Sequence, residues 1–210
     1  MEAFDIARTN MVKSQILPNR VLNNNVIETI QNTPRHIFVP DNKEKIAYID
    51  SFIPLDTNRY LLPPMVFAKM LEVIDIKGNE NVLDVACGTG YSSVILANLC
   101  KNVVAVESNT TLASQAHLNL NKLGIQNVII IGNELKDGHE ESSPYDIIFI
   151  NGAIKEQPGS LLNQLSENGR LVTIISKGDN YGAIILYKKN KLGIEKEEVF
   201  EVNLPVIEDF

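Results

Sequence analysis

The stretch VLDVACGTGYSS, residues 82–93, decides the fold of this chain. A short apolar run carries Asp84 and passes directly into a turn that holds Gly88 and Gly90. Glycine permits a positive φ and has no Cβ to keep a ligand away from the backbone. The two serines that follow suit the start of a helix, where free amide N–H groups point toward the turn. The stretch therefore predicts a strand, a turn and a helix, with a ligand crevice at the carboxyl end of the strand.

A second acid strengthens the prediction of a bound nucleotide-like molecule. Residues 101–107 read KNVVAVE, an apolar strand that closes on Glu107. A carboxylate at the end of this second strand can accept both hydrogen bonds of a ribose diol. A nicotinamide-binding domain would share Glu107, but it would prefer G-x-G-x-x-G, whereas Ala86 and Ser93 occupy the outer glycine positions here. A tight connection without any ligand is the plainer alternative for the turn.

The rest of the chain alternates between strand and helix patterns, as a mostly parallel sheet requires. Strands are expected at 82–86, 103–107, 127–131, 145–150 and 170–175, and helices near 91–99, 109–123 and 158–166. The strands are rich in valine and isoleucine and hardly alternate, which predicts burial on both faces. Beyond a loop at 178–182, an antiparallel pair at 183–187 and 196–202 is expected to close the sheet.

The N-terminal part follows a different pattern. Helices are expected at 5–15 and 24–31, and prolines interrupt the segment after them. Pro63 and Pro64 precede a helical pattern from Met65 to Val73, where a missing N–H does least harm. We therefore expect an N-terminal helical extension, residues 1–64, on a Rossmann-like domain, residues 65–210, as one compact unit.

Composition limits the classes of function. The chain has 210 residues and 44% hydrophobic content, enough for one substantial core. Cys87 and Cys100 form no disulfide framework, and neither they nor the three scattered histidines show metal-ligand spacing, so no metal is expected. A net charge of −7 argues against nucleic acid as a partner. The absence of a basic start and of a long apolar run predicts a cytoplasmic protein without a membrane partner.

Several further motifs follow one another in order. They are Ala7-Arg8-Thr9-Asn10-Met11-Val12, Pro34-Arg35 with Phe38-Val39-Pro40, Ala47-Tyr48-x-Asp50, the glycine turn, Pro144-Tyr145-Asp146 and Gly169-Arg170-Leu171-Val172. In this order and spacing the chain resembles the protein-L-isoaspartate O-methyltransferase family over nearly its whole length. The glycine turn alone would resemble any S-adenosylmethionine-dependent methyltransferase, and the proline-arginine signature narrows the resemblance to this family.

The resemblance implies a fold and a reaction. The fold would be that of Rossmann-like class I S-adenosylmethionine-dependent methyltransferases. The reaction would transfer the sulfonium methyl group to the free carboxylate of an L-isoaspartyl residue in a damaged protein or peptide, leaving S-adenosylhomocysteine and starting repair through a succinimide. Such a carboxylate is ionised at neutral pH, so catalysis needs positioning and exclusion of water more than a strong base.

The resemblance, with the chemistry of the turn, assigns a set of donor-binding residues. They are Asp84, Ala86, Cys87, Gly88, Thr89, Gly90, Tyr91, Ser92, Glu107, Ser108, Asn133, Glu134 and Asn151. Asn133 stands where the family usually has an aspartate near the adenine amine, and its carbonyl can still accept a hydrogen bond. Asn151 would lie near the methyl group. Each could equally be an ordinary loop residue, and Cys87 is interpreted as a packing residue rather than a nucleophile.

The chain departs from the family on the acceptor side. Residues 58–64, NRYLLPP, replace a glycine-glutamine-threonine-isoleucine-serine-x-proline run, and Leu62 takes the place of the serine. A hydrogen bond to a charged group is worth about 1.5 to 3 kcal/mol, or roughly 10- to 150-fold in rate. Arg59 is the nearby cation that could hold the acceptor instead, by a bidentate grip, and a solvated surface arginine is the alternative. The loop at 56–64 is expected to face the acceptor.

Three rival functions stay open at this point. One is a divergent methyltransferase that acts on another small molecule or protein carboxylate, selected by an apolar pocket at Leu61 and Leu62. Another is a non-catalytic protein that binds S-adenosylmethionine to support a partner-binding surface. The last is a nicotinamide-dependent oxidoreductase.

Overall fold

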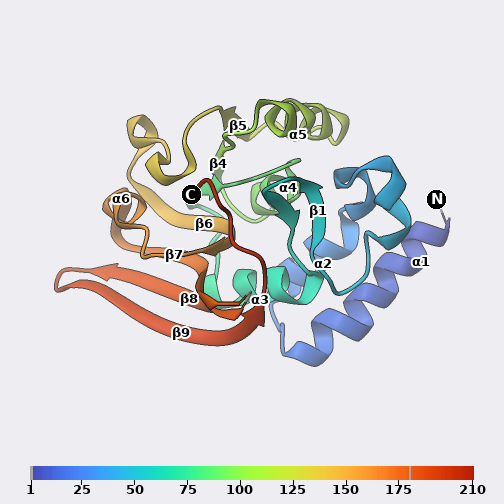
Figure 1. Cartoon of the computed structure of the whole chain (residues 1–210), viewed down its shortest axis with the longest axis horizontal. Helices are drawn as coiled ribbons and strands as arrows, with labels where there is room; N and C mark the ends of the chain where they lie inside the picture. Colours follow the sequence, from blue (N-terminus) through green and yellow to red (C-terminus); the bar gives the residue numbers. More distant parts are fainter. Residues whose placement is uncertain (1, 180) are drawn as a thin grey trace.

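The computed structural model describes residues 2–179 and 181–210, which form a seven-stranded sheet between layers of helices (Figure 1). The strand order is β5-β4-β3-β6-β7-β8-β9. The strands are β3 Asn81–Val85, β4 Asn102–Val106, β5 Val128–Ile131, β6 Tyr145–Ile154, β7 Leu165–Gly178, β8 Tyr181–Asn190 and β9 Gly193–Asn203. The first five are parallel, and β8 and β9 are antiparallel. The predicted mostly parallel α/β fold with a closing antiparallel pair is confirmed.

The helices fall close to the expected positions, with one clear error. They are α1 Glu2–Met11, which continues as a π-helical turn at Val12–Ile16, α2 Asn24–Asn32, α3 Pro64–Ile74, α4 Tyr91–Ala97, α5 Thr110–Lys122 and α6 Gly159–Asn163. The prediction of a helix over 158–166 was wrong at its end. Leu165 is only 2% exposed and pairs with Tyr145 at the start of β7, so the sheet captures the chain there.

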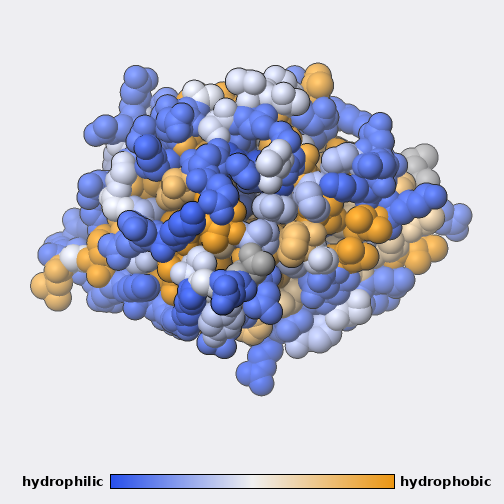
Figure 2. All heavy atoms as spheres, viewed as in Figure 1, coloured by the Kyte–Doolittle hydropathy of each residue, from blue (hydrophilic) through white to orange (hydrophobic). Residues whose placement is uncertain are grey.

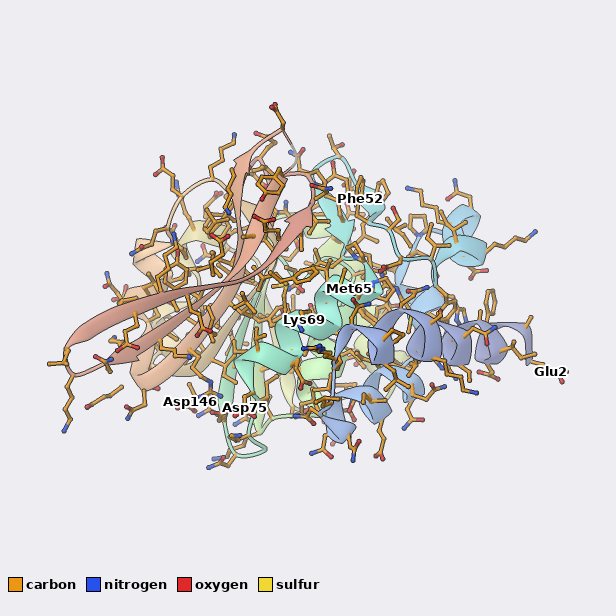
Figure 3. All side chains as sticks on the ribbon, turned by 90° about the horizontal axis from the view of Figure 1, so that it is seen from below. Glu2, Phe52, Met65, Lys69, Asp75 and Asp146 are labelled. Carbon is orange, nitrogen blue, oxygen red and sulfur yellow. The ribbon has the colours of Figure 1, made fainter. Side chains whose placement is uncertain are left out.

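Two apolar cores lie against the sheet. The larger core joins Met11, Ile16 and Phe38 of the N-terminal extension to α3, α4 and the strands. The smaller core holds Leu161 and Leu162 of α6 together with strand residues. Figure 3 shows α3 in the middle of the molecule, with Met65 near its start and Asp75 just past its end, between α1 and the β8–β9 arm. The extension therefore shares its core with the sheet domain.

The segment expected as an acceptor-side loop is largely a β-hairpin. β1, Ile53–Asp56, pairs antiparallel with β2, Arg59–Leu61, so the prediction of a loop over 56–64 was wrong for Asp56 and for residues 59–61. The C-terminal segment after β9 returns to the sheet, where the Ile207 amide donates to the Ala153 carbonyl at 2.8 Å. In Figure 1 this segment (red) crosses the sheet and stops near β4 and β6.

The remaining observations concern the loop before β8, the molecular surface and the lengths of the helices. Of the predicted loop at 178–182, Asn180 lies outside the described residues, while β7 extends to Gly178 and β8 begins at Tyr181. Figure 2 shows a mainly hydrophilic face with apolar side chains in scattered groups. Within the described ranges, no helix is long and apolar enough to cross a membrane.

Candidate donor and acceptor site

The candidate site lies at the carboxyl ends of β3, β4 and β6, which the parallel pairing brings to one edge of the sheet. Asp84 of β3 is fully buried and accepts hydrogen bonds from Ser92 Oγ at 2.8 Å, Ser93 Oγ at 2.6 Å and Asn151 Nδ2 at 2.6 Å. Burial raises the pKa of Asp84 to about 6, although the three donors oppose the shift. Asp84 therefore ties the first turn of α4 and the end of β6 to β3.

The glycine turn is held in left-handed backbone conformations. Gly88 has φ 56° and Gly90 has φ 91°, and Ala86 adopts φ 58° despite its side chain. A Cβ on Gly88 would lie 2.9 Å from Leu55 Cδ1 of the hairpin, and one on Gly90 would lie 3.2 Å from the Ala116 Cβ. Gly88 thus allows Leu55 of the hairpin to approach its backbone closely, whereas Gly90 permits close packing of α4 against α5.

Glu107 lies directly beside this turn and is fully buried. Its Oε2 accepts from the Gly88 amide at 2.9 Å, and its Oε1 accepts from the Asn109 amide at 3.0 Å. Arg59 Nε donates to both oxygens, at 3.0 Å and 3.1 Å. The carboxylate is therefore positioned by backbone groups on one side and capped by a guanidinium on the other.

Arg59 is 3% exposed, which excludes the alternative of a solvated surface arginine. Its Nη1 donates to Asp209 Oδ1 at 2.6 Å, and its Nη2 donates to Asp209 Oδ2 at 2.8 Å and to Ser108 Oγ at 2.7 Å. The hydrogen bonds from Arg59 hold the pKa of Asp209 down at about 2. The guanidinium is paired with the carboxylates of Glu107 and Asp209. In this conformation it is therefore not free for the predicted bidentate grip on an acceptor.

A nearly closed cavity of about 10 Å³ lies between the hairpin and the turn. It is lined from the hairpin and α3 by Leu55, Arg59, Tyr60, Leu61, Leu62 and Phe67, and from the sheet by Ala86, Cys87, Gly88, Tyr91, Ser92 and Asn151. Small-molecule sites usually have roughly 300 to 1,000 Å³. A ligand on the glycine turn would therefore have to displace side chains that fill this space, Leu55 and Arg59 of the hairpin among them.

Eight of the residues predicted from the sequence line this cavity, and the others do not line it. Thr89 Oγ1 donates to the Phe38 carbonyl at 2.6 Å, which fastens the N-terminal extension to the turn. Burial raises the pKa of the Cys87 thiol well above its usual value, which fits a packing role. Asn133 and Glu134 are exposed beyond β5, and Asn133 Nδ2 donates to the Gly138 carbonyl at 2.9 Å within its own loop.

Several residues at the site were not singled out from the sequence, and Leu55, Asp209 and Arg35 are among them. Leu55 packs over Gly88, and Asp209 reaches Arg59 across a separation of 150 residues, which no local pattern signals. Arg35 belongs to the Pro34-Arg35 motif, but the sequence did not indicate its role. It is fully buried, its Nε donates to the Ala47 carbonyl at 2.7 Å, and its Nη2 donates to the Leu62 carbonyl at 2.6 Å. Arg35 thereby positions the backbone of Leu62.

Comparison with known proteins decides the family. The model of the protein-L-isoaspartate(D-aspartate) O-methyltransferase family matches residues 7–207. The chain belongs to this family. A protein-L-isoaspartate O-methyltransferase of Geobacter metallireducens is 35% identical over 183 residues, which cover 87% of this chain and 84% of the relative. One of Syntrophus aciditrophicus is 35% identical over 172 residues, which cover 82% and 79%.

Solved structures show the same fold. A protein-L-isoaspartate O-methyltransferase superposes with a TM-score of 0.81 at 24% identity over 95% of this chain, which spans about 65% of that solved chain. A putative family member from Plasmodium falciparum, in complex with S-adenosyl-L-homocysteine, superposes with a TM-score of 0.79 at 22% identity, covering 97% of this chain and 99% of the other. The predicted methyltransferase fold and family are confirmed.

The family uses S-adenosylmethionine as its methyl donor. The residues at the edge of the sheet fit such a donor, because the buried carboxylate of Glu107 stands beside a glycine turn at the carboxyl ends of the parallel strands. In the described parts of the chain, no group of three or more acidic, cysteine or histidine side chains is arranged to hold a metal ion.

Proposed function

We propose that this chain is an S-adenosylmethionine-dependent carboxyl O-methyltransferase that esterifies the free carboxylate of L-isoaspartyl residues in damaged proteins. The observation that carries the proposal is the placement of Glu107 against the amide of Gly88 at the carboxyl edge of the sheet, in a chain whose family members bear this activity in their names. The roles of the predicted donor-binding residues, the boundary at residue 64 between the N-terminal extension and the Rossmann-like domain, and a cytoplasmic location stay predictions.

The residues on the donor side would have separate roles in binding S-adenosylmethionine. Glu107 would accept hydrogen bonds from the ribose diol once Arg59 has left it. The backbone from Ala86 to Gly88 would support the donor, and Asn151, fixed by Asp84, would border the methyl group. The bound donor supplies an electrophilic methyl group, and no metal is needed for its transfer to a carboxylate.

The acceptor side of the cavity is apolar. Leu61 and Leu62 are 6% and 4% exposed, and Phe67 packs behind them. An acceptor carboxylate is already ionised at neutral pH, so these side chains would assist by excluding water while the backbone aligns the carboxylate with the methyl group. They offer no hydrogen bond in place of the family's serine, and we therefore expect slow turnover rather than none.

A surface groove of about 510 Å³ on the other side of the hairpin is the proposed entry for the acceptor. Its lining includes Tyr60, which also lines the donor cavity, and Lys155, which pairs with Glu208 at 2.9 Å near the C-terminus. Tyr60 therefore separates the donor cavity from the groove. A peptide in this groove would present its carboxylate past Tyr60 toward Leu62.

The test is transfer of labelled methyl from S-adenosylmethionine to a peptide that contains L-isoaspartate, beside its twin that contains normal aspartate. The proposal predicts base-labile methyl ester on the isoaspartyl peptide and none on the twin. Label on neither peptide, with donor binding established, would contradict the isoaspartyl acceptor. It would favour a second candidate, a methyltransferase with a more apolar acceptor, for which the burial of Leu61 and Leu62 is the supporting observation.

A further inference from the structure

Three segments that are distant in sequence meet at Arg59. The arginine begins β2 of the hairpin, Glu107 and Ser108 follow β4, and Asp209 belongs to the C-terminal segment. The Glu107 and Arg59 side chains are 0% and 4% exposed, while that of Asp209 is 41% exposed. The cluster therefore runs from the buried edge of the sheet to the surface.

The acceptor capacity of Glu107 is already used. A carboxylate offers about four lone-pair positions. The Gly88 and Asn109 amides take two of them and cannot leave without disrupting the turn and the start of α5. Arg59 Nε contacts both oxygens on the remaining side. A ribose diol needs the same positions, so the guanidinium and the ribose compete for one carboxylate.

The hairpin that carries Arg59 also fills the space above the turn. Leu55 of β1 lies over Gly88, and Asp56 accepts a hydrogen bond from Asn109 Nδ2 at 2.7 Å, next to Glu107. The cavity beneath measures only about 10 Å³. The position of the hairpin therefore both places Arg59 on Glu107 and closes the cavity.

We infer that Arg59, held between Glu107 and Asp209, is a latch that keeps the donor cavity shut and that S-adenosylmethionine enters only when its ribose displaces the guanidinium from Glu107. This inference rests on the proposed function, because it concerns the same donor site. A bidentate ion pair with Asp209, whose carboxylate is partly exposed, gives the displaced guanidinium a partner outside the cavity. Donor affinity is then reduced by the fraction of molecules in which the latch is closed.

The latch predicts the direction in which removal of Arg59 changes the affinity for the donor. If Arg59 only supported the fold of the site, its removal would weaken donor binding. If it competes with the ribose, its removal strengthens binding. The experiment is calorimetric titration of S-adenosylhomocysteine into the wild type, Arg59→Gln and Arg59→Lys. We expect at least ten-fold tighter binding for Arg59→Gln. A smaller gain is expected for Arg59→Lys, because its ammonium keeps a positive charge beside Glu107 but cannot bridge two carboxylates as the planar guanidinium does.

Arg170→Gln is the matched control. Arg170 pairs with Glu80 at 2.9 Å in a largely buried ion pair at the opposite end of β3, so this variant loses a comparable pair and should leave the affinity unchanged. If Arg59→Gln does not fold, Arg59→Lys decides. Unchanged or weaker binding in the folded Arg59 variants, with binding by the wild type intact, would overturn the latch alone. Failure of the wild type and of every variant to bind would overturn both the latch and the proposed function.

Discussion

Asp84 offers the sharpest prediction about stability, because it is a fully buried carboxyl group with three hydrogen-bond donors and no cationic partner among its contacts. Burial raises its pKa from 3.8 to about 6. The folded protein therefore holds a proton on Asp84 at pH values where the unfolded chain has released it. The contribution of Asp84 to the free energy of unfolding is fully present below the unfolded pKa and is lost as the pH rises through the folded pKa.

The magnitude follows from the two pKa values. Between pH 4.5 and pH 7.5, a group that moves from 3.8 to about 6 on folding lowers the free energy of unfolding by about 2 kcal/mol. Asp84→Asn removes this titration but keeps a carbonyl acceptor for the serines. The free energy of unfolding of the wild type minus that of Asp84→Asn should therefore be about 2 kcal/mol lower at pH 7.5 than at pH 4.5.

The assay is urea unfolding of both proteins at pH 4.5 and pH 7.5. Asp146→Asn is the control, because Asp146 accepts from the Asn81 amide and Ser166 at the far end of the strands, away from the site. This variant should retain the pH dependence attributed to Asp84. Parallel pH profiles for wild type and Asp84→Asn would refute the assignment of a raised pKa to this carboxyl group.

Two further predictions concern packing and turnover. Gly90→Ala adds a Cβ at φ 91° and 3.2 Å from the Ala116 Cβ, so thermal unfolding should show a loss of about 2 kcal/mol or more, and an unchanged melting temperature would refute the packing role. Leu62→Ser restores a hydroxyl on the acceptor side, and kcat/KM for an isoaspartyl peptide should rise by roughly 10- to 150-fold. No gain on that peptide would mean that Leu62 does not face its carboxylate.

Local patterns were sufficient for much of the fold. The strand, glycine turn and helix around Gly88 follow from backbone conformation and apolar runs, and these act within a few residues. The positions of Glu107 and Asn151 could be predicted for the same reason, because parallel strands bring their carboxyl ends to one edge. The order and spacing of the motifs then indicated the family to which the chain belongs.

Contacts between distant segments could not be predicted in this way. The pair between Arg59 and Asp209 spans 150 residues, and nothing near either residue signals the other. The hairpin also depends on tertiary packing, since Ile53 and Leu61 are buried against the larger core. The end of α6 was missed because pairing of Leu165 with Tyr145 overrides a weak helical pattern.

The central claim is that Glu107 holds the donor, and titration of S-adenosylhomocysteine tests it most directly. The measurement compares Arg59→Gln with the double variant Arg59→Gln/Glu107→Ala, so that the latch is absent from both proteins. The account predicts that the double variant binds at least ten-fold more weakly, because two hydrogen bonds from the ribose to a charged group are lost. Equal affinity of the two proteins would contradict the assignment of Glu107 as the ribose-binding carboxylate.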